Sequence, residues 1–308
     1  MAKATTKTKK KRKSSLASRN ARSGFLFILP WIIGFAVLFL YPALQSLKYS
    51  FMNWDKDAIL NLKGQSDAAF TLANYEYALT GDATYIRDVV SSLGTMVYEV
   101  PLITFFSMFI AGLLNQKFAG RTIARMLFFL PVIIASGGII SILQSGGMST
   151  SIGGEESIYM FKTTAMEDIL VSTGISQDII NFLTTTVSKI FDITWKSGIQ
   201  ILLFLSGLQG VPSSYYEVSS MEGATAWEEF WKITFPLLSP TTLIAVVYTI
   251  VDSFTDYRNV VMTDIQTAYG ALELGRSAAY SWIYFVIIGI IIFLVNKIIF
   301  SKTVYIEE

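Results

Sequence analysis

The sequence predicts an all-α polytopic membrane protein with about six transmembrane helices. Hydrophobic residues make up 52% of the 308-residue chain and charged residues only 15%, whereas soluble domains carry about 25% charged residues. The mean hydropathy is +0.50. Six apolar runs with few charges are long enough, at roughly twenty residues each, to cross the hydrocarbon core of a bilayer as helices. The chain is therefore expected to be built from membrane-spanning helices.

These runs set the order of the predicted elements. The first follows a basic N-terminal segment, and a short polar link separates the second from the third. The fourth is the shortest, because Trp195 and Lys196 stand near its start. In chain order the predicted spans cover residues 25–47, 93–114, 124–143, 193–208, 241–261 and 278–300.

The N-terminal segment orients the predicted spans. Residues 1–22 contain nine Lys or Arg residues and no acidic residue, and such segments stay on the cytoplasmic side of a membrane. Because this segment adjoins a membrane span, binding to anionic lipid is a simpler interpretation of its basic charge than binding to nucleic acid. We predict a disordered cytoplasmic tail over 1–22, a transmembrane domain over 23–300 with an outer loop over 145–192, and a cytoplasmic C-terminal tail over 301–308.

The sequence lacks two features, and their absence excludes several kinds of catalytic, metal and nucleotide site. The chain has no His and no Cys, so disulfides, thiolate metal sites and imidazole catalysis are excluded. It also lacks the G-x-x-x-x-G-K-[ST] loop that cradles nucleotide phosphates. We predict no catalytic residue, no metal site and no cofactor bound directly by this chain.

A polar, glutamate-rich loop over residues 213–240 separates the fourth and fifth apolar runs. Ser214 and Glu217 have S-x-x-E spacing, and Thr225 and Glu228 have T-x-x-E spacing, which is typical of a capping box at a helix N-terminus. Gly223 stands between the two boxes and can adopt the left-handed conformation that ends a helix. The loop is therefore predicted to contain two short helices that meet at this glycine.

This loop resembles the EAA loop of ABC importer permeases, especially those of the binding-protein-dependent sugar transport family. The residues that carry the resemblance are Glu217, the Glu-Gly-Ala triplet at 222–224, Phe230, Ile233 and Pro236. Val218 and Ser219 replace two alanines of the family pattern, and Glu222 stands where aspartate is commoner. Residues 113–132 (LLNQKFAGRTIARMLFFLPV) and 252–263 (DSFTDYRNVVMT) extend the likeness along the chain.

The resemblance implies the type I ABC importer permease architecture, a multi-pass protein of a bacterial or archaeal cytoplasmic membrane with both termini in the cytoplasm. Residues 213–240 would form a cytoplasmic coupling loop that docks into a separate ATPase. The implied partners are a second, different permease, two ATPases that use ATP and Mg, and an extracellular substrate-binding protein. The chain would then be a transport subunit and not an enzyme. The implied ATPase-docking residues are Glu217, Val218, Ser219, Met221, Glu222, Gly223 and Ala224.

Three carboxylates fall inside the predicted spans, where an ionised side chain usually faces protein or water. Glu99 is in the second span, and Asp252 and Asp256 are in the fifth. If the helix continues, these two aspartates share a face with Tyr248. Carboxylates accept hydrogen bonds from sugar hydroxyls, and aromatic rings cover sugar C–H surfaces. We predict that these four residues, together with Gln200, line a carbohydrate pathway.

Alternatives to this interpretation stay open. The same polar groups could instead satisfy one another between helices, or pair with Lys196 or Arg258. The three carboxylates could bind protons or cations in an ion-coupled secondary transporter, and the loop motif is shared with ABC permeases for solutes other than sugars. The outer loop 145–192 would contact a binding protein, cap the pathway or pack as an insertion on its own outer surface. The leading hypothesis is the permease subunit of an ATP-driven carbohydrate importer.

Overall fold

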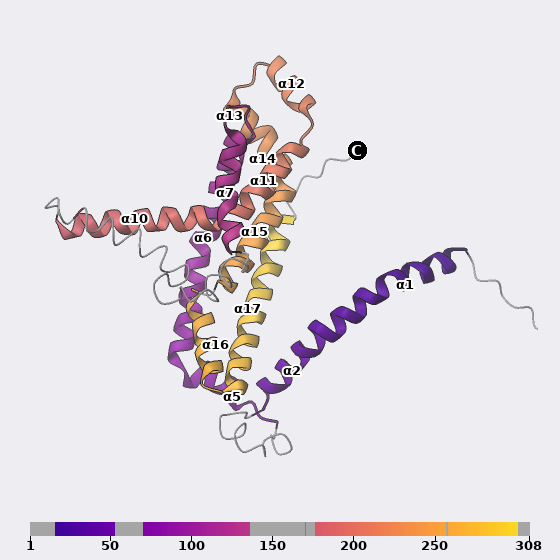
Figure 1. The fold of residues 1–308 in the computed structure, drawn as a ribbon, viewed down its shortest axis with the longest axis vertical. Helices are drawn as coiled ribbons and strands as arrows, with labels where there is room; N and C mark the ends of the chain where they lie inside the picture. Colours follow the sequence, from indigo (N-terminus) through magenta and orange to yellow (C-terminus); the bar gives the residue numbers. More distant parts are fainter. Residues whose placement is uncertain (1–15, 53–69, 136–169, 171–175, 257, 301–308) are drawn as a thin grey trace, which may run out of the picture. The chain divides into compact units, whose positions relative to one another are not determined.

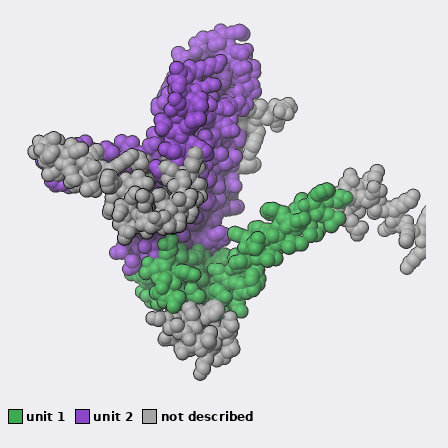
Figure 2. All heavy atoms as spheres, viewed as in Figure 1, with its two compact units in different colours: residues 1–83, 265–283 green, residues 84–264, 284–308 purple. Residues whose placement is uncertain are grey.

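The computed structural model describes residues 16–52, 70–135, 170, 176–256 and 258–300 (Figure 1). Within these residues the regular elements are helices and no strand occurs, as the sequence predicts. The chain forms two compact units, which Figure 2 colours green and purple. Unit 1 consists of residues 1–83 and 265–283, and unit 2 of residues 84–264 and 284–308. The predicted tail segments 1–15 and 301–308 lie outside the described residues.

Unit 1 begins with three consecutive helical segments, α1 (Leu16–Phe35), η1 (Ala36–Leu40) and α2 (Tyr41–Ser50). The π-helical turn η1 ends two residues before Pro42, which has no N–H to bond the carbonyl of residue 38. α1 starts at Leu16, so helix extends into the part of the chain that the sequence predicts as a disordered tail. From residue 23 onward this helical run is apolar and long enough to cross a membrane.

The start of α5 (Ala73–Glu76) packs against the end of α2. η2 (Tyr77–Gly81) follows in the chain. The hydroxyl groups of Ser50 and Tyr75 lie 2.7 Å apart, and the Asn74 amide donates to the backbone carbonyl of Ser50. Further along the unit, the Tyr280 hydroxyl donates to Asp82 Oδ2 at 2.6 Å. These bonds join segments that are distant in the sequence.

Unit 2 contains the longest described helix and the loop over 213–240. Its apolar elements meet in one core, built from the C-terminal half of α6, from α7 and α11, and from the first half of α15. Figure 1 shows α12 and α13 at one end of this unit. The elements wholly or partly in unit 2 are α6 (Ala83–Asn115), α7 (Arg121–Ala135), α10 (Gln177–Lys196), α11 (Gly198–Gly210), α12 (Ser213–Met221), α13 (Ala226–Glu229), η4 (Phe230–Thr234), α14 (Phe235–Leu237), α15 (Ser239–Thr255), α16 (Val260–Gly270) and α17 (Leu274–Phe300).

Within this core, α11 and α15 approach each other closely at Gly207. A Cβ atom at this position would lie 2.5 Å from Thr241 Oγ1 and 3.0 Å from Leu238 Cδ2. Phe204, which is fully buried, lies one turn earlier on α11. The missing side chain therefore sets the separation between α11 and α15.

Gly207→Ala is expected to destabilise unit 2 by about 1–3 kcal/mol, because overpacking of a filled core forces neighbouring side chains to move. The measurement is the midpoint of thermal unfolding of the purified protein in detergent. The matched control is Gly210→Ala on the same helix, where an added Cβ meets no atom within 4 Å. Equal midpoints for the two variants would contradict the close contact at Gly207.

Three described helices are long and apolar enough to cross a membrane, namely Ser23–Ser50, Ala83–Asn115 and Leu274–Ile299. They contain the first, second and sixth predicted spans almost completely. Residues Ala226–Leu237 and Ser239–Thr255 satisfy the same test only as a pair, and they are bent by 69°. The total of six spans stays a prediction, since part of the third lies outside the described residues.

Two predicted spans differ from the structure. The fourth is not one straight helix, because α10 ends at Lys196, α11 begins at Gly198, and the chain turns at Ser197 (Figure 1). The fifth ends early, because Asp256 leaves the helix with φ −57° and ψ 127°. The condition for Asp252 and Asp256 to share a helix face, a helix that continues through both, is therefore not met. Tyr248 and Asp252 remain one turn apart on α15.

Candidate functional site

The turn at Gly223 has the geometry that the sequence predicts. Its φ is +77°, in the left-handed region that favours glycine. The N–H of Gly223 donates to the carbonyl of Ser220, and the N–H of Ala224 donates to the carbonyl of Ser219. These two bonds form a Schellman motif, which satisfies the last carbonyl groups of α12. α12 and α13 therefore form a helix-turn-helix with a defined bend.

Only one of the two predicted capping boxes is present. The Thr225 hydroxyl accepts a hydrogen bond from the Glu228 N–H, and the Glu228 carboxylate accepts one from the Thr225 N–H. The other prediction is wrong, because α12 starts at Ser213 with Pro212 as its N-cap and no side-chain cap. Ser214 is therefore already inside the helix. Pro212 has an extended backbone at the N-cap, with φ −60° and ψ 135°, and the helix begins one residue before Ser214.

The capping box has a measurable electrostatic consequence. The Thr225 N–H and the Lys232 ammonium lower the pKa of Glu228 from 4.5 to about 2. Because the folded pKa lies below the ordinary value, ionised Glu228 stabilises the start of α13 above pH 4.5. We expect this contribution to disappear as the pH falls from about 4.5 to about 2. Carboxyl NMR of specifically labelled protein checks this, and a Glu228 titration midpoint at the ordinary value would contradict it.

The helix-turn-helix presents apolar side chains on its surface. Met221 is 83% exposed and Trp227 is 71% exposed, and Val218 is also exposed. A concavity of about 770 Å³ lies between α12 and the α13–η4 segment. Its lining residues are Ser214, Tyr215, Val218, Ser219, Glu222, Gly223, Ala224, Glu228, Glu229, Lys232 and Ile233.

The predicted docking residues divide into two groups. Ser219 is buried and Ala224 is half-buried, and both belong to the bonded end of α12. Their contribution is therefore to the shape of the turn. The residues with exposed side chains or backbone are Glu217, Val218, Met221, Glu222 and Gly223.

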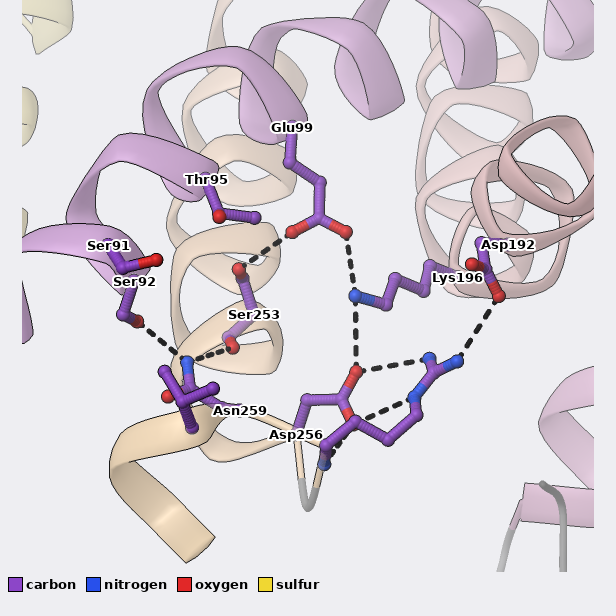
Figure 3. A pocket seen from close by; sticks show the side chains of 11 residues that line it. Ser91, Ser92, Thr95, Glu99, Asp192, Lys196, Ser253, Asp256 and Asn259 are labelled. Carbon is purple, nitrogen blue, oxygen red and sulfur yellow. Dashed lines mark hydrogen bonds and ion pairs between the residues drawn. The ribbon is translucent and has the colours of Figure 1, made fainter. Parts of the chain in front are cut away.

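Two of the three predicted intramembrane carboxylates pair with one lysine. Lys196 Nζ lies 2.6 Å from Glu99 Oε1 and 3.1 Å from Asp256 Oδ2 (Figure 3). The three side chains are 13–16% exposed. They come from α10, α6 and the residue after α15. The ammonium group therefore ties three elements together at one largely buried point.

Arg258 extends this ionic cluster to a further acid. Its guanidinium lies 3.1 Å from Asp256 Oδ2 and 3.2 Å from Asp192 Oδ1. The Asp256 side chain also accepts the N–H of Arg258, which holds the short segment after α15 in place. Two cations and three carboxylates thus alternate across the cluster, which we call the Lys196 cluster: Glu99, Asp192, Lys196, Asp256 and Arg258.

Uncharged polar groups surround the Lys196 cluster. Ser253 donates to Glu99 Oε2 at 3.0 Å, and the Asn259 amide donates to Ser92 Oγ at 2.8 Å (Figure 3). Together with the cluster they line a cavity of about 320 Å³. The complete lining is Ser91, Ser92, Thr95, Glu99, Asp192, Lys196, Ser253, Asp256, Arg258, Asn259 and Val260.

The structure brings only two of the five predicted pathway residues into this cavity. Glu99 and Asp256 line it, whereas Tyr248 and Asp252 are not among its lining residues. Gln200 is fully buried, and its amide donates to Thr249 Oγ1 at 3.0 Å between α11 and α15. The proposed alternative, pairing with Lys196 and Arg258, is the arrangement that the structure shows for Glu99 and Asp256.

Sequence reasoning missed most of the cavity's polar lining. Lys196 and Arg258 entered only as possible partners of the carboxylates, although a lysine at the start of an apolar run was itself a signal. Asp192 and Asn259 had no such signal, because the contacts of Asp192 with Arg258 and of Asn259 with Ser92 join residues distant in the chain. In the part of the chain that the structure describes, no group of three or more His, Cys, Asp or Glu residues is placed to hold a metal ion.

Known proteins resemble the chain in sequence and in fold. No family model matches it. It is 29% identical over 306 residues, 93% of both chains, to the probable ABC transporter permease protein YesP of Bacillus subtilis. It is 25% identical over 288 residues, 87% of this chain and 92% of the other, to the multiple sugar-binding transport system permease protein MsmF of Streptococcus mutans. The fold is similar to that of a chain in the crystal structure of a bacterial alginate ABC transporter, solved in complex with an alginate pentasaccharide-bound periplasmic protein. The TM-score is 0.62 and the sequence identity is 17%, and the match covers 92% of this chain and 96% of the other.

Proposed function

We propose that this chain, which belongs to the permease subunits of ABC importers of the sugar transport family, forms half of a transmembrane pathway for a mono- or oligosaccharide. The observation that carries the proposal is the similarity to permeases over 93% of both chains. Relatives such as the multiple-sugar permease of Streptococcus mutans support a carbohydrate as the cargo. The helix-turn-helix at Gly223 supports coupling to a separate motor.

The coupling loop would receive motion from the ATPase. Its exposed apolar residues Val218 and Met221 suit a hydrophobic contact, and Glu217 and Glu222 add charge that selects the partner's orientation. The Schellman motif at Gly223 would transmit force because it fixes the angle between α12 and α13. The ATPase would bind ATP and Mg, and this chain would need no cofactor of its own.

The polar cavity would contribute this chain's share of the pathway. The hydroxyl groups of Ser91 and Thr95 offer donors and acceptors that match sugar hydroxyls, and the bond between Asn259 and Ser92 fixes the wall beside them. The carboxylate of Glu99 pairs with Lys196, and that of Asp256 pairs with Lys196 and Arg258, so each largely buried acid has a cation beside it. Sugar binding at such a site would depend on hydrogen bonds and not on net charge.

The complete importer would contain other subunits. We propose a second, different permease, two ATPases and an extracellular substrate-binding protein, in a bacterial or archaeal cytoplasmic membrane. Both termini and the coupling loop would face the cytoplasm, as the basic segment 1–22 predicts.

The test is purification of the chain in mild detergent from its native membrane, followed by mass spectrometry of the proteins that accompany it. A P-loop ATPase and a second permease are the expected companions, and Glu217→Lys should release the ATPase. Glu76→Lys, also at an exposed glutamate but on α5, is the matched control. A chain that purifies alone and transports with an ion gradient would overturn the proposal in favour of a secondary carrier.

A further inference from the structure

α10 carries a stripe of exposed apolar side chains along most of its length. Their exposed fractions lie between 38% for Leu183 and 69% for Phe182. Apart from the adjacent Phe182 and Leu183, they recur at intervals of three or four residues, which places them on one side of a helix. Ile180 and Thr184, at the edge of this side, are buried. The stripe consists of Ile179, Phe182, Leu183, Val187 and Ile190.

The charged residues of α10 lie beside the stripe, on one flank of the polar side of the helix. At about 100° per residue, Asp178, Lys189, Asp192 and Lys196 fall within one narrow arc that contains none of the stripe. They are two acids and two bases, so the helix has no net charge. Asp192 and Lys196 belong to the Lys196 cluster, and their ion pairs fix the rotation of α10 about its own axis.

The direction of α10 differs from that of its neighbours. Figure 1 shows α10 extending sideways from the other helices of unit 2, and α10 contacts α7. α7 exposes apolar side chains of its own, including Met126 and Leu127. α10 does not satisfy the length and hydropathy test for a membrane span among the described helices. It is too polar on one side to cross a bilayer and too apolar on the other to lie in water.

The point along α6 that the end of α10 contacts indicates the depth of α10 in the membrane. Lys196 at the end of α10 contacts Glu99, which lies sixteen residues before Asn115 at the end of α6. That separation is about 24 Å along the helix at 1.5 Å per residue. Asn115 lines a cavity with Ala226 and Glu229 of α13, so this end of α6 lies beside the coupling loop. In a hydrocarbon core of about 30 Å, α10 therefore lies near the face opposite the coupling loop.

We propose that α10 lies in the plane of the membrane–water interface on the face opposite the coupling loop, with its apolar stripe inserted among lipid acyl chains. Amphipathic helices of low net hydrophobicity bind interfaces in this way. The five residues of the stripe are all apolar, and the hydroxyl groups of Thr186 and Thr194 on the same side donate to backbone carbonyls of α10 itself, so this side offers no free polar group that would select a protein partner. The lipid contact would hold Asp192 and Lys196 at the depth of the polar cavity.

The absence of native cysteine allows a direct test of this placement. Phe182→Cys and Ile190→Cys sample the stripe, and Asn181→Cys and Thr185→Cys sample exposed positions on the polar side. Each variant of the purified transporter carries a bimane label in phosphatidylcholine nanodiscs, with nitroxide lipids that quench near the headgroup or deep in the acyl region. We expect shallow quenching at both stripe positions, at least about twofold stronger than at the polar positions.

Equal depths at Phe182 and Ile190 are the second expected result. If α10 crossed the membrane instead, these positions would differ in depth by about 12 Å, and the deep quencher would separate them. If a protein partner covers the stripe, lipid quenching is absent and a water-soluble maleimide reacts slowly at both positions. Either result would overturn the interfacial placement. Leu183→Cys is a second stripe position should Phe182→Cys not fold, and the result does not depend on the identity of the cargo.

Discussion

Lys196→Ala is expected to cost about 3–5 kcal/mol of stability, because it removes the shared cation of two largely buried carboxylates. Glu99 Oε1 and Asp256 Oδ2 lie 2.6 Å and 3.1 Å from the lysine ammonium. Without it, Glu99 keeps only the Ser253 hydroxyl among the polar contacts shown for its carboxylate. α6 and α10 would lose the ion pair that joins them. The measurement is the thermal midpoint of the purified protein in detergent, together with uptake by reconstituted transporter.

Variants of Lys196 that keep or remove its charge distinguish the loss of the ion pairs from the loss of side-chain packing. Lys196→Arg keeps a cation and should retain most of the stability, whereas Lys196→Met fills similar space without charge and should behave like the alanine variant. Combining Lys196→Met with Glu99→Gln and Asp256→Asn removes the unpaired charges and should recover part of the loss, since the penalty for a lone buried charge disappears. A wild-type midpoint for Lys196→Met would show that the pairs contribute little.

Gly223→Pro is expected to abolish transport while leaving the membrane helices folded. Proline fixes φ near −65° and has no N–H, whereas Gly223 has φ +77° and donates to the Ser220 carbonyl. The Schellman motif at the end of α12 would be lost, and the angle between α12 and α13 would change. Uptake and ATPase association are the measurements, with far-UV circular dichroism to verify that the helix content is preserved.

Gly223→Asn is the matched control for this substitution. Asparagine adopts the left-handed conformation more readily than other non-glycine residues and keeps the N–H donor. We expect this variant to retain ATPase association and most of the uptake. Normal transport by the proline variant would mean that the turn at Gly223 does not transmit force.

Residues close together in the chain determined most of what sequence analysis predicted correctly. The all-helical class follows from apolar runs of membrane-spanning length, and the turn at Gly223 and the cap at Thr225 each depend on residues within five positions. Local patterns failed where two signals competed. Ser214 matched a capping box, but Pro212 began the helix earlier, and the apolar run after residue 241 concealed the end of helix at Asp256.

The tertiary structure alone decided the composition of the polar cavity. Lys196 and Glu99 are 97 residues apart, and Asn259 and Ser92 are 167 apart, so no local pattern pairs them. The sequence by itself determined that Glu99 and Asp256 need partners, because a charge is costly inside a membrane. Which partners they have depends on the turn at Ser197 and on the early end of α15. These bring α10 and the segment after α15 to the same face of α6, and the ion pairs form there because each buried charge is satisfied only by a neighbour from another helix.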